Sequence, residues 1–155
     1  MDKAIHLIEF ETMLLGRYLQ LGAPRSGRGG GRLDRSAYTL LSRIRVQGPM
    51  SIGQLSDAFG LDASTLNRQT AAMLRAGLVE RIPDPDGGIA RKFRITAEGE
   101  AGLDAERAQN ISGLERVMAA WSPAEVADLA AYLERLNSDI EHLDGRPWPR
   151  PGRPA

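Results

Sequence analysis

The stretch SIGQLSDAFGLDASTLNRQTAAMLRAG, residues 51–77, contains two helix start signals in close succession. Ser51 can accept a hydrogen bond from the Gln54 amide while the Gln54 side chain reaches back, which is a capping box. The helix that begins there is predicted to end at Gly60. Asp62 is then a good N-cap for a second helix, which runs to the end of the stretch. Two helices joined by a short turn that contains glycine have the spacing of a helix-turn-helix.

The second of these helices, Ala63 to Gly77, has an apolar side and a polar side. The residues predicted to turn inward are Leu66, Thr70, Met73 and Leu74. No acidic residue lies between Asp62 and Glu80, and the outward side combines small residues, two arginines and an amide. Small residues allow close approach to a surface, and Asn and Arg side chains can hydrogen-bond base edges. The outward set is Ser64, Arg68, Ala71, Ala72 and Arg75, with Thr65 and Asn67 on the flanks.

A β-hairpin is predicted directly after this helix. A strand begins at Leu78, and the stretch IPDPDGGIARKFRIT, residues 82–96, has Asp-Pro followed by Asp-Gly-Gly, which favours a turn. The residues that then alternate with the period of a strand are Ile89, Arg91, Phe93 and Ile95. Helix-turn-helix followed by a hairpin is the order of a winged helix. Cations just past a hairpin tip often serve only to prevent a strand edge from pairing with another chain. Because this hairpin follows a helix with an acid-free outer face, we expect Arg91 and Lys92 to contact DNA.

Apolar residues at both ends of the chain exceed what a small winged lobe can cover. Those of the first helix, Ala4 to Leu21, include Ile5, Ile8, Leu14 and Leu15, and those of the last helix include Leu129, Leu133, Leu136 and Ile140. Exposed stripes of this size are unusual on a monomer, so a homodimer is predicted. A two-fold axis would present the two reading helices to a palindrome with half-sites about one turn of B-DNA apart, or a multiple of it.

The expected fold class is mainly α with a small β-wing, a winged helix-turn-helix lobe plus a helical dimerisation region. The run GAPRSGRGGGR lacks the lysine and the preceding strand of a phosphate-binding loop, so it is interpreted as a connector. The final residues are Pro, Gly and Arg, which cannot build a core. The predicted segments are residues 1–22, an N-terminal dimerisation helix; 23–33, a Gly/Arg-rich loop; 34–96, the winged helix-turn-helix domain; 97–144, C-terminal dimerisation helices; and 145–155, a disordered tail.

Composition excludes several classes of function. Lys plus Arg and Asp plus Glu number 20 each, so a nucleic-acid footprint must be a local cluster of charge. Cysteine is absent, which excludes disulfides and thiolate metal sites. His6 and His142 have no metal-ligand spacing and no neighbouring nucleophile, so no enzyme, catalytic residue, metal or cofactor is expected. No apolar run reaches the roughly 18 residues of a membrane span, and no signal peptide opens the chain, so a soluble cytoplasmic protein without membrane contact is expected.

From about Leu33 to Leu143 the chain resembles the MarR family of bacterial transcriptional regulators. The resemblance rests on GPMSIGQLSDAFGLDASTLNRQTAAMLRAGLVERIPDPDGGIARKFRITAEG followed by two helices, with the AGLVER junction, the Asp-Pro wing tip and Thr-x-x-Gly. It implies a homodimer with interlocked terminal helices, binding a palindromic DNA operator as a repressor or activator. It also implies release by a small-molecule effector. The residues it would place in the major groove are Ser64, Thr65, Asn67 and Arg68.

Two expectations from the resemblance concern the wing and the effector. Family wings usually carry Asp and then Arg near the tip, whereas this chain has Gly87 and Ile89 there, and Arg91 and Lys92 are the nearest cations. The aromatic residues that the family would place around the crevice between lobe and dimer region are Tyr18, Tyr38, Trp121 and Tyr132. Core packing is the alternative for these aromatics. The alternative to DNA binding is a winged-helix module that binds a protein.

Overall fold

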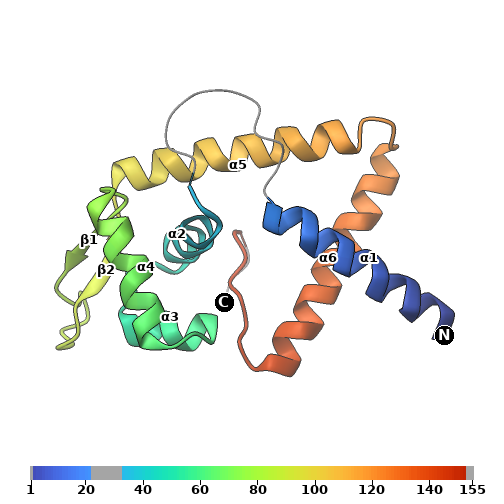
Figure 1. Cartoon of the computed structure of the whole chain (residues 1–155). Coiled ribbons are helices and arrows are strands. Elements are labelled where there is room, and N and C mark those ends of the chain that lie inside the picture. Colours follow the sequence, from blue (N-terminus) through green and yellow to red (C-terminus); the bar gives the residue numbers. More distant parts are fainter. Residues whose placement is uncertain (1, 22–32, 153–155) are drawn as a thin grey trace.

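A computed structural model describes residues 2–21 and 33–152, excluding the side chains of residues 2, 20 and 21 (Figure 1). The mainly α fold with a small β-wing is confirmed. The Gly/Arg-rich loop predicted at residues 23–33 lies outside the described residues, apart from Leu33. No helix in the described part of the chain is long and apolar enough to cross a membrane. The elements are α1 (Asp2–Leu21), α2 (Arg35–Gln47), α3 (Ile52–Phe59), α4 (Ala63–Arg75), β1 (Val79–Ile82), β2 (Lys92–Ile95), α5 (Ala97–Val117) and α6 (Pro123–Asp144).

The predicted helix start signals form as hydrogen bonds. Gln54 N–H donates to Ser51 Oγ at 3.2 Å, and Ser51 N–H donates to Gln54 Oε1 at 2.9 Å, which completes the capping box of α3. Gly60 ends α3 with φ of +64°, a conformation that glycine adopts without steric cost. A second capping box, between Ser122 and Glu125, opens α6. These bonds satisfy backbone N–H groups that have no partner within the helix.

The hydrophobic core lies between α2, α3, α4, the hairpin and the start of α5, a unit that we call the winged lobe. Its strands pair antiparallel, with Val79 opposite Ile95 and Ile82 opposite Lys92. Met50, just before α3, exchanges two backbone hydrogen bonds with Phe93 of β2, at 3.1 and 2.8 Å. The hairpin is thereby fixed to the helix-turn-helix. The buried apolar residues are Ala37, Leu40, Leu41, Ile44, Met50, Leu55, Leu66, Met73, Val79, Phe93 and Leu103.

The turn after α4 packs directly against the start of α5. Thr96 Oγ1 donates to the carbonyl oxygen of Gly77 at 2.6 Å and accepts the N–H of Gly99 at 3.0 Å. A Cβ at Gly99 would lie 2.1 Å from the carbonyl oxygen of Leu78. Only glycine therefore fits at this place, which explains the Thr-x-x-Gly pattern of the sequence.

The hairpin and α5 are shorter than predicted. The strand expected from Ile89 begins at Lys92; Ile89 and Ala90 form an exposed bend, and Arg91 is exposed before the strand. The helix expected to run towards Trp121 ends at Val117, and a turn leads to α6. An alternating sequence pattern does not predict where a strand ends, because backbone hydrogen bonding also depends on the length of the partner strand.

Helices α1 and α6 contain no buried residue among those that the structure describes. Figure 1 shows α5 leading from the winged lobe to α6. Large apolar side chains on these helices are about half exposed in the single chain, for example Ile8 at 51 % and Leu136 at 42 %. The excess of apolar surface predicted for the two ends is therefore present.

The prediction of a disordered tail is wrong for Gly145 to Arg150. The indole ring of Trp148 packs against Phe59 of α3 at a centroid distance of 5.2 Å. Arg150 donates to Glu141 of α6 at 2.6 Å. A segment rich in Pro, Gly and Arg cannot form a hydrophobic core of its own. This tail instead packs against the core formed by the rest of the chain.

Gly99→Ala should destabilise the winged lobe by about 1–3 kcal/mol, because the new methyl group overlaps a backbone oxygen that cannot move freely. Thermal unfolding followed by circular dichroism would measure the loss. Gly53→Ala in α3 is the matched control, since the nearest atom to its Cβ would be 3.9 Å away. Equal melting temperatures for the two variants would contradict the tight junction.

Candidate nucleic-acid interface

The outward face of α4 is polar, small and free of acid, as the sequence predicted. Leu66, Thr70 and Met73 are buried on the inner side. Because residues that are four or seven apart share a helix face, Ser64, Arg68 and Arg75 lie on one outer face, and all of them are exposed. Asn67 is exposed beside this face.

The first turn of α4 is organised by Asp62. Its carboxylate accepts the N–H of Thr65 at 2.8 Å and the hydroxyl of Ser64 at 3.1 Å. Hydrogen bonds from Thr65 hold the pKa of the Asp62 carboxyl below its ordinary value. Thr65 is half-buried, and its hydroxyl accepts a weak hydrogen bond from Arg68 Nη2 at 3.4 Å. The small polar side chains of this turn are therefore partly used in positioning the helix and Arg68.

The Lys92 side chain does not face solvent, as the predicted contact with DNA would require. Its ammonium is 3.2 Å from the carboxylate of Asp84 and 3.9 Å from that of Asp86, and its side chain is only 11 % exposed. Asp84 is similarly shielded, at 14 %. The expected contact between Lys92 and DNA is therefore withdrawn, because the charge is neutralised inside the hairpin. The sequence could not show this ion pair, because the approach of Asp84 to Lys92 depends on the conformation of the hairpin turn.

The wing turn is built around Asp84. Its carboxylate accepts the N–H of Asp86 at 2.9 Å, the main reason why the pKa of Asp84 lies below its ordinary value. Gly88 packs so closely that a Cβ there would be 2.2 Å from Asp84 Oδ2, and Gly87 has φ of +83°. This compact turn holds the exposed residues Ile89, Ala90 and Arg91 at the tip side of the hairpin. Arg91 is thus the cation of the predicted wing pair that faces solvent.

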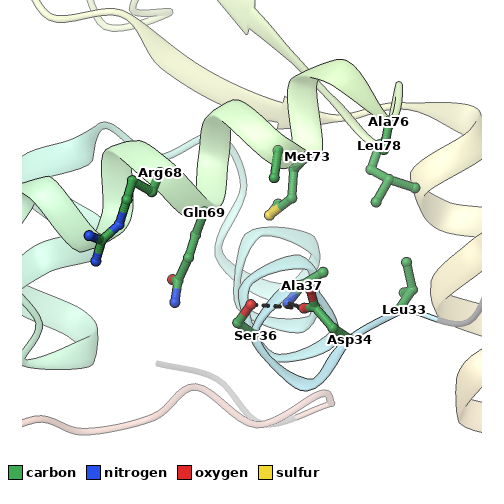
Figure 2. A pocket seen from close by; sticks show the side chains of 10 residues that line it. Leu33, Asp34, Ser36, Ala37, Arg68, Gln69, Met73, Ala76 and Leu78 are labelled. Carbon is green, nitrogen blue, oxygen red and sulfur yellow. Dashed lines mark hydrogen bonds between the residues drawn. The ribbon is translucent and has the colours of Figure 1, made fainter.

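A pocket of about 470 Å³ lies between α4 and the start of α2 (Figure 2). Gln69 extends from α4 towards α2, and Arg68 lies at the same end of the pocket (Figure 2). The Gln69 Oε1 atom is shielded from solvent and has no hydrogen-bond partner in the described part of the chain. The lining is Leu33, Asp34, Ser36, Ala37, Arg68, Gln69, Ala72, Met73, Ala76 and Leu78. Sequence reasoning missed this pocket, because its residues come from separate elements without a shared motif.

Of the four aromatic residues proposed for an effector, Trp121 and Tyr132 line a common hollow of the described chain, and Tyr18 and Tyr38 do not line it. Tyr38 of α2 is half-buried and packs against the core, as the alternative interpretation expected. Tyr18 is 60 % exposed on α1. Trp121 and Tyr132 line a separate, shallow hollow at the turn between α5 and α6. None of these residues lines the pocket beside α4.

Comparison with known proteins identifies the family. A sequence model of the MarR family matches residues 33–87. YxaD of Bacillus subtilis (strain 168), an uncharacterized HTH-type transcriptional regulator, is 34 % identical over 134 residues, which are 86 % of this chain and 92 % of that protein. The chain belongs to the MarR family. A MarR family protein from Bacillus stearothermophilus shares the fold with a TM-score of 0.65 and 21 % identity, over 90 % of this chain and 91 % of that one. A further MarR family transcription regulator has a TM-score of 0.69 and 20 % identity, over 94 % and 95 %.

Membership of the MarR family makes this chain a transcriptional regulator and not an enzyme. Regulators of the family bind DNA, usually as dimers that respond to small-molecule effectors. The MarR match covers α2 to the wing turn, and so includes α4 with its acid-free face. Because regulators of this family bind DNA, α4 and the wing are the candidate DNA-binding elements of this chain.

Arg91 and Lys92 are neighbours with equal charge and different surroundings, so they form a matched pair. Arg91→Gln should lower the dependence of log affinity on log salt by about one unit, as expected for one lost phosphate contact, and leave the melting temperature unchanged. Lys92→Gln should lower the melting temperature, because Asp84 loses its partner. Affinity measured by fluorescence anisotropy across salt concentrations would test both. An unchanged salt slope in Arg91→Gln would remove Arg91 from the interface.

Proposed function

We propose that this MarR regulator binds a palindromic operator as a homodimer, with α4 of each protomer in the major groove, and acts as a repressor. The observation that carries this proposal is the outer face of α4, on which Ser64, Arg68 and Arg75 are exposed; no residue of the helix itself is acidic, and Asp62 at its start is engaged as the N-cap. A face of this kind can approach the negatively charged backbone closely. A repressor would act by occupying the operator and excluding polymerase.

Each exposed residue of α4 receives a role that suits its chemistry. Arg68 can donate two parallel hydrogen bonds to a guanine edge, and Asn67 can pair with adenine. Ser64 and Thr65 lie in the first turn, where small hydroxyl residues allow the helix to enter the groove. Arg75 is in the last turn and suits a phosphate. Arg91 of the wing is assigned to a phosphate as well, so it would position the lobe without reading sequence.

The homodimer is proposed from the exposed apolar faces of α1 and α6. Leu133 and Ile140 are 40 % and 53 % exposed in the single chain, and they lie seven residues apart on one helix face. Contiguous apolar surface of this kind is costly in water, whereas a second copy would cover it. A two-fold axis through these helices would pair the two winged lobes for two half-sites.

Release by a small molecule is proposed at the pocket beside α4. The unpartnered Oε1 of Gln69 offers an acceptor to a ligand that carries a donor. A ligand in this pocket would contact Arg68, so ligand and DNA would compete for the same side chain. This site is proposed beside the group Tyr18, Tyr38 and Trp121 predicted from the sequence, none of which lines it.

Arg68→Ala should weaken operator binding by about 1–3 kcal/mol and leave the fold intact, because an exposed side chain with base or phosphate contacts is lost. The operator would be obtained by selection of the wild-type protein on random duplex DNA, and affinities would then be measured by gel shift. Arg107→Ala, an exposed arginine on α5, is the control for the lost charge. If selection enriches no sequence, the protein-binding module becomes the better assignment. Equal affinity of Arg68→Ala and wild type would remove Arg68 from the reading helix.

Leu133→Asp should dissociate or unfold the dimer and abolish operator binding although α4 is untouched, because a carboxylate would be buried between apolar faces. Multi-angle light scattering would measure the mass. Ala131→Asp places the same charge on a different, exposed face of α6 and should remain dimeric. A stable wild-type monomer that binds a single half-site tightly would contradict the homodimer.

A further inference from the structure

The segment after α6 returns towards the winged lobe (Figure 1), and its Trp148 contacts α2 and α3 of that lobe. The Trp148 ring packs edge-on against Phe59 of α3, with centroids 5.2 Å apart and an interplanar angle of 84°. The guanidinium of Arg43, from α2, lies 4.8 Å from the centroid of the Trp148 ring. Edge-to-face aromatic pairs and cations over an indole are both favourable arrangements. One residue of the tail thus bridges α2 and α3.

The same segment is held to α6 by Glu141. The Glu141 carboxylate accepts the backbone N–H of Trp148 at 3.0 Å and two N–H groups of Arg150 at 2.6 and 3.0 Å. The two bonds from one guanidinium to one carboxylate fix orientation as well as distance. The hydrogen bond from Arg150 is the main reason why the pKa of Glu141 lies below its ordinary value. Gly145, with φ of +68°, ends α6 and turns the chain back.

A third contact lies at the end of α3. Arg146 Nε donates to the carbonyl oxygen of Asp57 at 3.2 Å, and Arg146 Nη1 donates to Asp144 at 2.9 Å. The Arg146 guanidinium passes so close to Gly60 that a Cβ there would lie 2.9 Å from Cζ. The tail therefore follows the surface of α3 instead of touching it at one point.

The surroundings of Arg43 indicate that Trp148 belongs in this position. Arg43 is buried, at 7 % exposure, and burial lowers its pKa while the charge of Glu141 raises it. Its Nε donates to Gln47 at 2.8 Å, whereas its Nη1 has no hydrogen-bond partner among the described residues. A buried guanidinium is stabilised by a π face and a nearby carboxylate, and the tail and α6 supply these two groups.

These contacts matter because α6 is otherwise only loosely connected to the winged lobe. No residue of α6 is buried, and in the described chain the close packing of the lobe involves α2–α5 and the hairpin rather than α6. Units joined by one helix are expected to move relative to each other unless a further interface holds them. With the tail in place, lobe, α5, α6 and tail form a closed ring.

We propose that the segment Gly145 to Arg150, which we call the clasp, fixes the winged lobe against α6 and thereby sets the separation of the two reading helices. Trp148 is then a positioning residue for operator binding, although it lies away from the outer face of α4. The inference rests on the proposed homodimer, because α6 lies at the two-fold axis while α4 is carried by the lobe. Half-sites recur about every 34–36 Å along B-DNA, so a fixed angle between lobe and α6 selects one spacing.

The first experiment tests the clasp without DNA. The sequence has two tryptophans, so Trp121→Phe leaves Trp148 as the only one. In this protein Trp148 should be shielded from acrylamide, and adding Phe59→Ala should expose it. Small-angle X-ray scattering should show a larger radius of gyration for Trp148→Ala than for wild type. Quenching of Trp148 as fast as in an unfolded chain, or equal radii, would overturn the clasp.

The second experiment tests its effect on spacing. The probe is duplex DNA selected by the wild-type protein, with one to three base pairs inserted or removed between the half-sites. Trp148→Ala should lose about tenfold in affinity at the selected spacing, a size expected for a lost aromatic and cation–π contact, and should bind the altered spacings almost equally well. Arg150→Ala should do the same to a smaller extent, whereas Arg135→Ala, an exposed arginine of α6, should keep the wild-type profile.

The two experiments separate the clasp from the proposed function. A shielded Trp148 with an unchanged spacing profile in Trp148→Ala would show that the tail docks but positions nothing, which overturns the inference. If the wild type selects no DNA while Trp148→Ala still expands the free protein, the operator proposal fails and the clasp between lobe and α6 stands.

Discussion

The burial of Leu66, Thr70 and Met73 determines which side of α4 faces solvent, and the interface follows from that choice. These residues pack into a core shared with α2 and the hairpin, so α4 cannot rotate about its axis without exposing them. Thr70 also donates its hydroxyl to the carbonyl oxygen of Leu66 at 2.7 Å, which satisfies its one buried polar group. The outer face is therefore fixed as the face of Ser64, Arg68 and Arg75. In physical terms, the hydrophobic core positions the polar interface.

A chain with equal numbers of acidic and basic residues can still present a cationic surface if its acids are paired elsewhere. In the wing, Asp84 binds Lys92 and Glu80 binds Arg94, so two of the acids there are paired within the hairpin, while Asp86 stays exposed at 3.9 Å from the Lys92 ammonium. Because Lys92 is buried in its ion pair with Asp84, it is not available to contact DNA, whereas Arg91 is exposed. Salt screens the charge of the exposed Arg91 beyond about 8–10 Å. Arg91 therefore suits a direct contact with a backbone phosphate rather than long-range attraction of DNA.

The parts that the sequence predicted well are those decided by local chemistry. The capping boxes at Ser51 and Ser122 and the N-cap at Asp62 involve residues two or three positions apart, so their geometry is present in the pattern itself. The ion pair that shields Lys92 and the docking of the tail through Trp148 were not predicted, and the reason is the same for both. Each depends on a partner that only the folded chain brings near, Asp84 across the hairpin turn and Phe59 from a distant helix. Composition predicts that a Pro-rich tail cannot form a core. It does not predict that such a tail can pack over the core of the winged lobe.

In the proposed function, the connection between the winged lobe and α6 is a further determinant of DNA recognition. The base contacts proposed for α4 would define which half-site is preferred, but a palindrome would also demand a fixed distance between its two half-sites. A rigid ring that includes α5, α6 and the tail can meet this demand, because it reduces the conformations that the free protein must give up on binding. Arg43 shows how closely the ring is linked to the core, since it contacts Gln47 within α2 and Trp148 in the tail. Through Arg43 the tail contacts α2, which packs against α4 beside the pocket where an effector is proposed to bind. In the proposed function, half-site spacing, base contact and release by an effector would all depend on the same small group of packed helices.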